Sequence, residues 1–174
     1  MPAFLITGIP GAGKTTVSNL LARRFQRAAH IEADRLQGLI VSGGLWPDQE
    51  PHDEAMRQLA LRARNAALLA ESFSEAGFVP VIDDIVVVRE RLAIYTERLP
   101  DLHVVVLAPS VEVALERDDK RGYKRVGERW RHLDQEQREA LTDKDILWID
   151  SSELSTEETV DAILARRARE RPGH

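Results

Sequence analysis

Five short apolar runs alternate along the chain with longer stretches in which apolar residues recur every three or four positions. The runs lie at about residues 3–8, 28–34, 78–84, 102–109 and 145–150. The stretches with helical spacing lie at about residues 13–24, 53–76, 88–99, 110–119 and from 155 onward, where Ser155 and Glu158 have the spacing of a capping box. Strands without alternation are typical of a parallel sheet covered by helices on both faces. The pattern predicts an α/β fold, with a single domain over residues 1–174.

The first apolar run leads directly into Gly8-Ile9-Pro10-Gly11-Ala12-Gly13-Lys14-Thr15, which fits the phosphate-loop pattern G-x-x-x-x-G-K-[ST] between a strand and a helix. Glycines permit a positive φ and leave room for successive N–H groups to surround phosphates. Lys14 is expected to reach the β- and γ-phosphates, and the Thr15 hydroxyl to ligate Mg²⁺. The residues predicted to bind ATP are Gly8, Ile9, Pro10, Gly11, Ala12, Gly13, Lys14, Thr15 and Thr16.

Carboxylates follow the second and third apolar runs. Asp34 ends the second run. The carboxyl ends of parallel strands face the ligand crevice of such a sheet, so Asp34 is a candidate general base. The alternative is that Asp34 is the N-cap of a following helix. Asp83 and Asp84 end the third, the arrangement that reaches Mg²⁺ in phosphoryl-transfer proteins. Asp83 is the predicted metal residue beside Thr15, and Asp84 stays an alternative.

Residues 35–52 are rich in glycine and proline, which predicts a loop or broken helix of the kind that carries substrate contacts. The next predicted helix, at about 53–76, has a polar face with Arg57, Arg62, Arg64 and Asn65. That face could line a substrate cleft, but exposure to solvent is the favoured interpretation.

The composition narrows the class of protein. No apolar run approaches the ~20 residues of a membrane span, and the N-terminus lacks a basic leader, so a cytoplasmic protein is expected. There is no cysteine for a disulfide or a thiol nucleophile. The net charge of −5 makes a long nucleic acid an improbable partner. A monomer or homodimer is expected.

Basic residues nevertheless gather in one segment of this acidic chain: Arg117, Lys120, Arg121, Lys124, Arg125, Arg129 and Arg131. We interpret about 117–135 as an arginine-rich lid that closes over bound nucleotide, with Arg121 and Arg125 as candidates for contact with the transferred phosphoryl group. The alternative is a solvated charged segment.

The order of these parts resembles small-molecule P-loop kinases of the nucleoside-monophosphate-kinase-like group, most closely chloramphenicol phosphotransferase-like proteins and more distantly shikimate and gluconate kinases. The resemblance implies a three-layer sandwich with strand order 2-3-1-4-5, Mg·ATP as phosphoryl donor and Asp34 as general base. It also implies that adenine lies between Arg117 and the turn Ser151-Ser152-Glu153. The segment 117–133 is more basic and aromatic than expected for a chloramphenicol phosphotransferase, which argues against an antibiotic substrate.

Three functions remain open at this point. The favoured one is an ATP-dependent phosphotransferase acting on a hydroxyl of a small molecule. A nucleoside, nucleotide or polynucleotide 5′-hydroxyl kinase would use Arg62, Arg64 or the lid to hold an acceptor phosphate. A regulatory protein that binds ATP without a small acceptor has less need of Asp34 and of the 35–52 loop.

Overall fold

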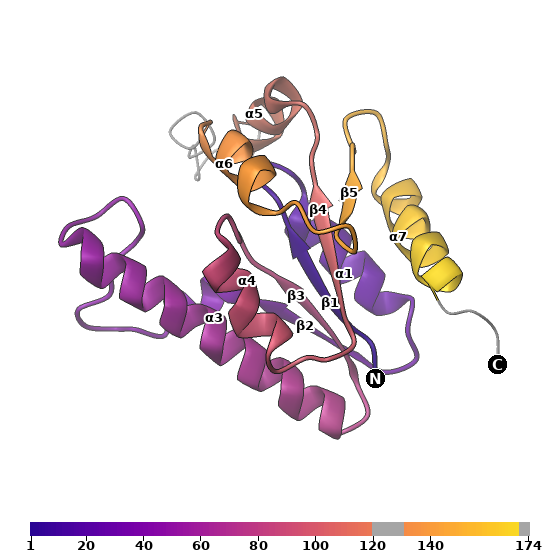
Figure 1. Cartoon of the computed structure of the whole chain (residues 1–174), viewed down its shortest axis with the longest axis horizontal. Coiled ribbons are helices and arrows are strands. Elements are labelled where there is room, and N and C mark those ends of the chain that lie inside the picture. Colours follow the sequence, from indigo (N-terminus) through magenta and orange to yellow (C-terminus); the bar gives the residue numbers. More distant parts are fainter. Residues whose placement is uncertain (120–130, 171–174) are drawn as a thin grey trace.

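The computed structural model of the chain describes residues 1–119 and 131–170. Its centre is a parallel sheet with the strand order β2-β3-β1-β4-β5 (Figure 1). The strands are β1 (Ala3–Thr7), β2 (Ala28–Glu32), β3 (Val79–Asp83), β4 (Leu102–Leu107) and β5 (Leu147–Ile149). The predicted fold class and strand order 2-3-1-4-5 are therefore confirmed. Every strand lies within one of the apolar runs, because a parallel sheet covered on both faces buries its strands.

Helices cover both faces of the sheet. They are α1 (Lys14–Arg23), α2 (Ala33–Gln37), α3 (His52–Glu75), α4 (Arg89–Thr96), α5 (Val111–Asp119), α6 (Leu133–Ala140) and α7 (Thr156–Glu170). Neighbouring residues of β1 pack on opposite faces of the sheet. Phe4 packs with Leu21 of α1 and Ile163 of α7. Leu5 packs with Ala63 of α3 and Tyr95 of α4. This alternation divides the core into two layers and fixes which helix faces which side chain.

The segment after β2 differs from the prediction. The strand ends at Glu32 rather than at Asp34, and α2 follows at once with Glu32 as its N-cap. Asp34 is the second residue of α2, so it neither ends a strand nor caps the helix. The predicted loop 35–52 is shorter than expected, because α2 continues to Gln37 and α3 begins at His52.

Two buried glutamines fasten that loop to the helices on either side of it. Gln37 donates to the carbonyl of Leu45 at 2.8 Å. Gln58 accepts from the Leu45 N–H at 2.7 Å and donates to the carbonyl of Gly43 at 2.8 Å. Backbone groups that a loop would otherwise leave to water are thus satisfied by side chains. The middle of the loop is held against α2 and α3.

The predicted lid overlaps two helices. Arg117 belongs to α5, and residues 133–135 belong to α6. Arg121, Arg125 and Arg129 lie outside the described residues. On the far side of that gap, Gln137 of α6 is buried and donates to the Thr7 hydroxyl at 3.2 Å and to the Val86 carbonyl at 2.6 Å. These bonds dock α6 at the carboxyl end of β1.

The start of α7 has the reciprocal capping pattern that Ser155 and Glu158 predict. The Ser155 N–H donates to the Glu158 carboxylate at 2.8 Å, and the Glu158 N–H donates to the Ser155 hydroxyl at 3.1 Å. These hydrogen bonds lower the pKa of Glu158. Across residues 1–119 and 131–170, no helix combines the length and apolar character that a membrane crossing requires.

Candidate active site

The phosphate loop follows β1 and turns into α1 through glycines with positive φ. Gly11 has φ +82°, and a Cβ there would lie 2.0 Å from the carbonyl oxygen of Ala114 in α5. Gly13 has φ +92°, but a Cβ there would meet no heavy atom within 4 Å. Gly11 therefore permits close packing of the loop against α5, whereas Gly13 turns the chain beside open space.

The start of α1 suits an anion. Gly13 is its N-cap, and no side chain among the described residues caps the helix. First-turn N–H groups have no partner within a helix, and the helix dipole is positive there. Lys14 folds back over the loop and donates through Nζ to the carbonyls of Gly8 at 3.0 Å and Ile9 at 3.1 Å. Backbone donors and an ammonium group thus converge on one concave loop, which fits a triphosphate.

An open hollow of about 520 Å³ lies beside the start of α1 and the end of β2, and its lining includes Thr15, Thr16, His30 and Glu32. Asp83 comes from the adjacent strand β3, and its Oδ2 lies 2.7 Å from Nε2 of His30. The Asp83 side chain is only 9% exposed, whereas that of Glu32 is 24% exposed. Both carboxylates are candidates for a cation near Thr15.

Mg²⁺ in nucleotide sites keeps several waters and takes one or two protein ligands beside the phosphates. Within the described part of the chain, no three His, Cys, Asp or Glu side chains are grouped to hold a metal ion by themselves. A threonine hydroxyl with one carboxylate fits the phosphate-bound kind of site. Glu32 was not predicted from the sequence, although its place two residues before Asp34 at the end of a strand was a usable signal.

Asp34 forms an ion pair with Arg62, a buried arginine of α3. Nη1 of Arg62, from α3, donates to Oδ1 of Asp34 at 3.0 Å, and Nη2 donates to Oδ1 of Asp84 at 2.5 Å. The Arg62 side chain is 4% exposed, so the prediction that this position faces solvent is wrong. The carboxylates on either side make burial of the guanidinium tolerable, because an unpaired charge would be costly there.

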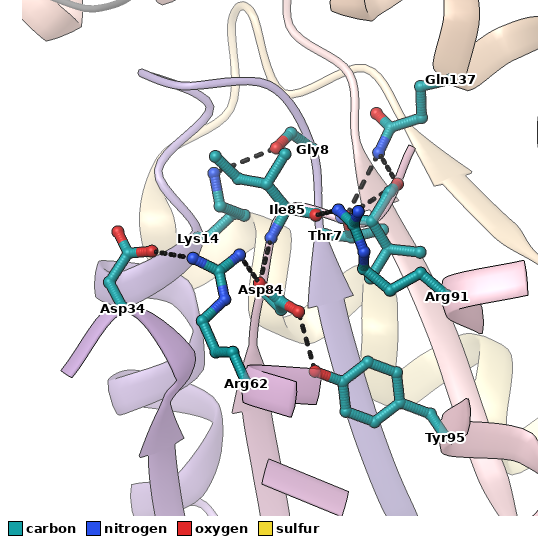
Figure 2. Close-up of polar contacts among 11 residues, drawn as sticks. Thr7, Gly8, Lys14, Asp34, Arg62, Asp84, Ile85, Arg91, Tyr95 and Gln137 are labelled. Atoms are coloured by element: carbon teal, nitrogen blue, oxygen red, sulfur yellow. Dashed lines mark hydrogen bonds and ion pairs between the residues drawn. The ribbon is translucent and has the colours of Figure 1, made fainter. Parts of the chain in front are cut away.

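Asp84 accepts hydrogen bonds from the protein on both of its carboxylate oxygens. Its Oδ1 accepts from the N–H of Ile85 at 2.8 Å as well as from Arg62, and its Oδ2 accepts from the hydroxyl of Tyr95 at 2.8 Å (Figure 2). The Asp84 side chain is fully buried. These contacts occupy both carboxylate oxygens of Asp84, whereas His30 contacts one oxygen of Asp83 and Arg35 contacts one oxygen of Glu32.

Burial and neighbouring charges shift the pKa values of three groups in this cluster. Burial alone would lower the pKa of Arg62, but Asp84 and Asp34 outweigh it and raise the pKa, so Arg62 stays charged. Burial, together with the neighbouring charge of Asp84, raises the pKa of Tyr95. Burial lowers the pKa of Arg91, which donates to the carbonyl of Ile85 at 3.4 Å. Neither Tyr95 nor Arg91 was predicted from the sequence, because no motif or spacing marks them.

Arg117 lies against the turn after β5. Its Nη2 donates to the carbonyls of Ser151 at 3.0 Å and Ser152 at 3.4 Å. The Ser152 hydroxyl accepts from the Ser110 N–H at 2.8 Å and donates to Asp150 at 2.5 Å, a bond that lowers the pKa of Asp150. The turn is thus tied to the start and the end of α5.

The sequence from residue 5 to residue 143 matches the AAA domain family. The chain belongs to this family. The match runs through the phosphate loop, Asp34, Arg62 and Asp84, and ends in the segment between α6 and β5. A search of the curated proteins returned no match to this chain.

Solved structures resemble this protein over nearly the whole chain. A gluconokinase from Sinorhizobium meliloti 1021 is 24% identical, with a TM-score of 0.65 and coverage of 97% of this chain and 92% of the gluconokinase. A shikimate kinase from Acinetobacter baumannii in complex with shikimate is 20% identical, with a TM-score of 0.68 and coverage of 99% and 96%. The tunicamycin resistance protein of Deinococcus radiodurans is 20% identical, with a TM-score of 0.67 and 95% coverage of both chains. The resemblance to small-molecule P-loop kinases is confirmed at the level of the fold.

Proposed function

We propose that this protein transfers the γ-phosphoryl group of Mg·ATP to a hydroxyl of a small molecule. The observation that carries the proposal is the position of a carboxylate, Asp34, at the same edge of the sheet as the phosphate loop. β2 leads to Asp34 and β1 leads to the loop, and only β3 separates the two strands. Phosphoryl transfer needs a phosphate cradle and a group that orients the nucleophile, and these are the two parts that share this edge.

Each residue has a defined task in this proposal. The loop from Gly8 to Thr15 holds the phosphates, with Lys14 on the β- and γ-phosphates. Arg117 and the turn at Ser152 hold adenine. Asp34 accepts the proton of the acceptor hydroxyl as the hydroxyl oxygen bonds to the γ-phosphorus and the bond from phosphorus to the bridging oxygen of ADP breaks. Arg121 and Arg125 neutralise charge on the transferred group.

Mg²⁺ would be held by Thr15 and one carboxylate, Glu32 or Asp83, and would neutralise charge on the phosphates. The hollow beside Thr15 supports this proposal, because Glu32 lines it and Asp83 contacts His30, which lines it as well. Since ATP is abundant in the cytoplasm, we propose that the protein acts there.

The nucleotide or polynucleotide kinase hypothesis has less support. It would hold an acceptor phosphate with Arg62, Arg64 or the lid, and the lid residues Arg121, Arg125 and Arg129 lie outside the described residues. Arg62 is engaged by two carboxylates, and Arg64 is exposed on the opposite side of α3 from the buried residues. A regulatory ATP-binding protein would bind Mg·ATP without turnover of any acceptor, which the following experiment distinguishes.

The test is a thermal-shift screen of hydroxyl compounds with and without Mg·ATP, followed by measurement of ADP release with each compound that raises the unfolding midpoint. Specific binding stabilises the folded state by mass action. We expect at least one neutral small alcohol to bind and to give stoichiometric ADP and phosphorylated product. Stabilisation by Mg·ATP alone, with no phosphorylated acceptor across sugars, sugar acids, nucleosides and oligonucleotides, would overturn the proposal in favour of a regulatory protein.

A further inference from the structure

Arg62 is an almost completely enclosed charged group on the acceptor side of the site. Its side chain is 4% exposed, and its two terminal nitrogens point to different carboxylates, one at the surface and one inside the protein. The inner carboxylate, Asp84, is fully buried, while the outer one, Asp34, is 41% exposed. Figure 2 shows Arg62 between them, with Tyr95 on the far side of Asp84.

This geometry leaves Arg62 little capacity for an acceptor. An arginine that recognises a carboxylate or phosphate does so by presenting two parallel N–H groups. Here Nη1 is directed to Asp34 and Nη2 to Asp84, and the remaining nitrogen, Nε, is buried with no hydrogen-bond partner among the described residues. Binding an acidic ligand would require the ion pair with Asp34 or that with Asp84 to break.

Asp84 explains why Arg62 is held so firmly. Tyr95 is buried completely on α4 and donates to Oδ2, while the backbone N–H of Ile85 donates to Oδ1. A carboxylate with three fixed donors has one orientation, and it fixes the guanidinium that binds it. Asp34 is thereby connected to the buried end of β3 and to α4 through a single rigid side chain.

We propose that Arg62 is a positioning residue for Asp34, and that Asp84 and Tyr95 hold Arg62 in place for that task. The inference rests on the proposed function, in which Asp34 is the general base. Arg62 orients one oxygen of Asp34, so that the other oxygen faces the acceptor hydroxyl. It does not bind the acceptor, and an acidic group on the acceptor gains nothing from it.

The kinetic test uses Arg62→Lys with the acceptor found in the screen. A lysine keeps the charge but offers a single point of contact, so it cannot hold Asp34 and Asp84 in the same geometry. We expect kcat to fall by ~10²-fold, the usual effect of a misplaced catalytic group, while the KM for the acceptor changes less than about three-fold. Tyr95→Phe, which removes only the hydroxyl, should lower kcat in the same way but less.

The matched control is Arg64→Lys, two positions along the same helix on its exposed side. It should leave kcat and KM at the wild-type values. A rise in the acceptor KM of Arg62→Lys without loss of kcat would show that Arg62 binds the acceptor and would overturn the proposal. Unchanged kinetics in both Arg62→Lys and Tyr95→Phe would overturn it as well.

A second measurement needs no acceptor. Asp34 and Tyr95 are joined through Arg62 and Asp84, so their effects on stability should be additive unless those two residues couple them. Denaturant unfolding of Asp34→Asn, Tyr95→Phe and the double variant should be non-additive in the wild-type background and additive when Arg62 is replaced by lysine. Additivity in the wild type would refute the rigid connection, whatever the protein phosphorylates. Coupling without any phosphorylated acceptor would instead leave the connection intact and count against the proposed function.

Discussion

The phosphate loop draws its groups from consecutive residues, Gly8 to Thr15, whereas the cluster around Asp34 draws its side chains from α2, α3, α4 and the end of β3. The loop uses mainly backbone N–H groups, which any sequence supplies once the glycines permit the turn. The cluster uses side chains that are 28 and 22 residues apart in sequence. A contiguous motif can thus specify the nucleotide side, whereas the acceptor side depends on how distant elements pack.

The largest expected effect is a loss of kcat on replacing Asp34, on the acceptor side of the site. Asp34→Asn is nearly isosteric and removes the proposed base, so kcat on the acceptor should fall by ~10²–10⁴-fold. The KM for ATP should stay within a few-fold of wild type, because the phosphate loop is untouched. Steady-state kinetics and unfolding midpoints measured on the same preparations provide the check. Parallel losses of stability and activity would assign Asp34 a structural role instead.

The next largest expected effect is a loss of turnover on replacing Lys14, on the nucleotide side of the site. Lys14→Ala removes an ammonium group from the β- and γ-phosphates, and turnover should fall by ~10²–10³-fold. Acceptor binding, followed by thermal shift in the absence of ATP, should be retained, since Lys14 belongs to the nucleotide side. Wild-type turnover in this variant would mean that the loop does not hold the transferring phosphates.

Two glycines of the phosphate loop differ in the space around them, and their alanine variants should differ in stability. Gly13→Ala should destabilise the fold by about 1–2 kcal/mol, because alanine disfavours a positive φ. Gly11→Ala has that strain and also a Cβ 2.0 Å from the Ala114 carbonyl oxygen, so it should cost about 1–3 kcal/mol more. Denaturant unfolding of the two variants gives the difference. Equal losses would show that α5 moves away without resistance.

The smallest expected effect concerns the cation. Glu32→Gln should raise the Mg²⁺ concentration needed for half-maximal rate by about ten-fold, because a neutral amide is a weaker partner for Mg²⁺ or its bound water. Asp83→Asn should raise it less, since Asp83 is more buried than Glu32 and is paired with the partly buried His30, whereas the partner of Glu32, Arg35, is exposed. Magnesium titrations of both variants at fixed ATP decide the order. The reverse order would make Asp83 the metal residue.

Local pattern was sufficient for several features of this chain. The apolar runs identified the five strands, because burial on both faces demands apolar residues throughout. The capping box at Ser155 and Glu158 depends on residues three positions apart and was equally visible. The boundary between β2 and α2 could not be predicted from the local pattern, because Ala33 and Asp34 suit a strand end and a first helical turn alike.

The sequence by itself determined the parallel α/β fold and the phosphate loop, since both depend on spacing and on glycine stereochemistry within short windows. Only the tertiary structure decided the environment of Arg62. On its helix this residue has the periodicity of a polar face, and its burial depends on Asp34 and Asp84, which arrive from two other elements. A charge is stable in the interior only where partners surround it, and partners far apart in sequence come together only when the chain folds.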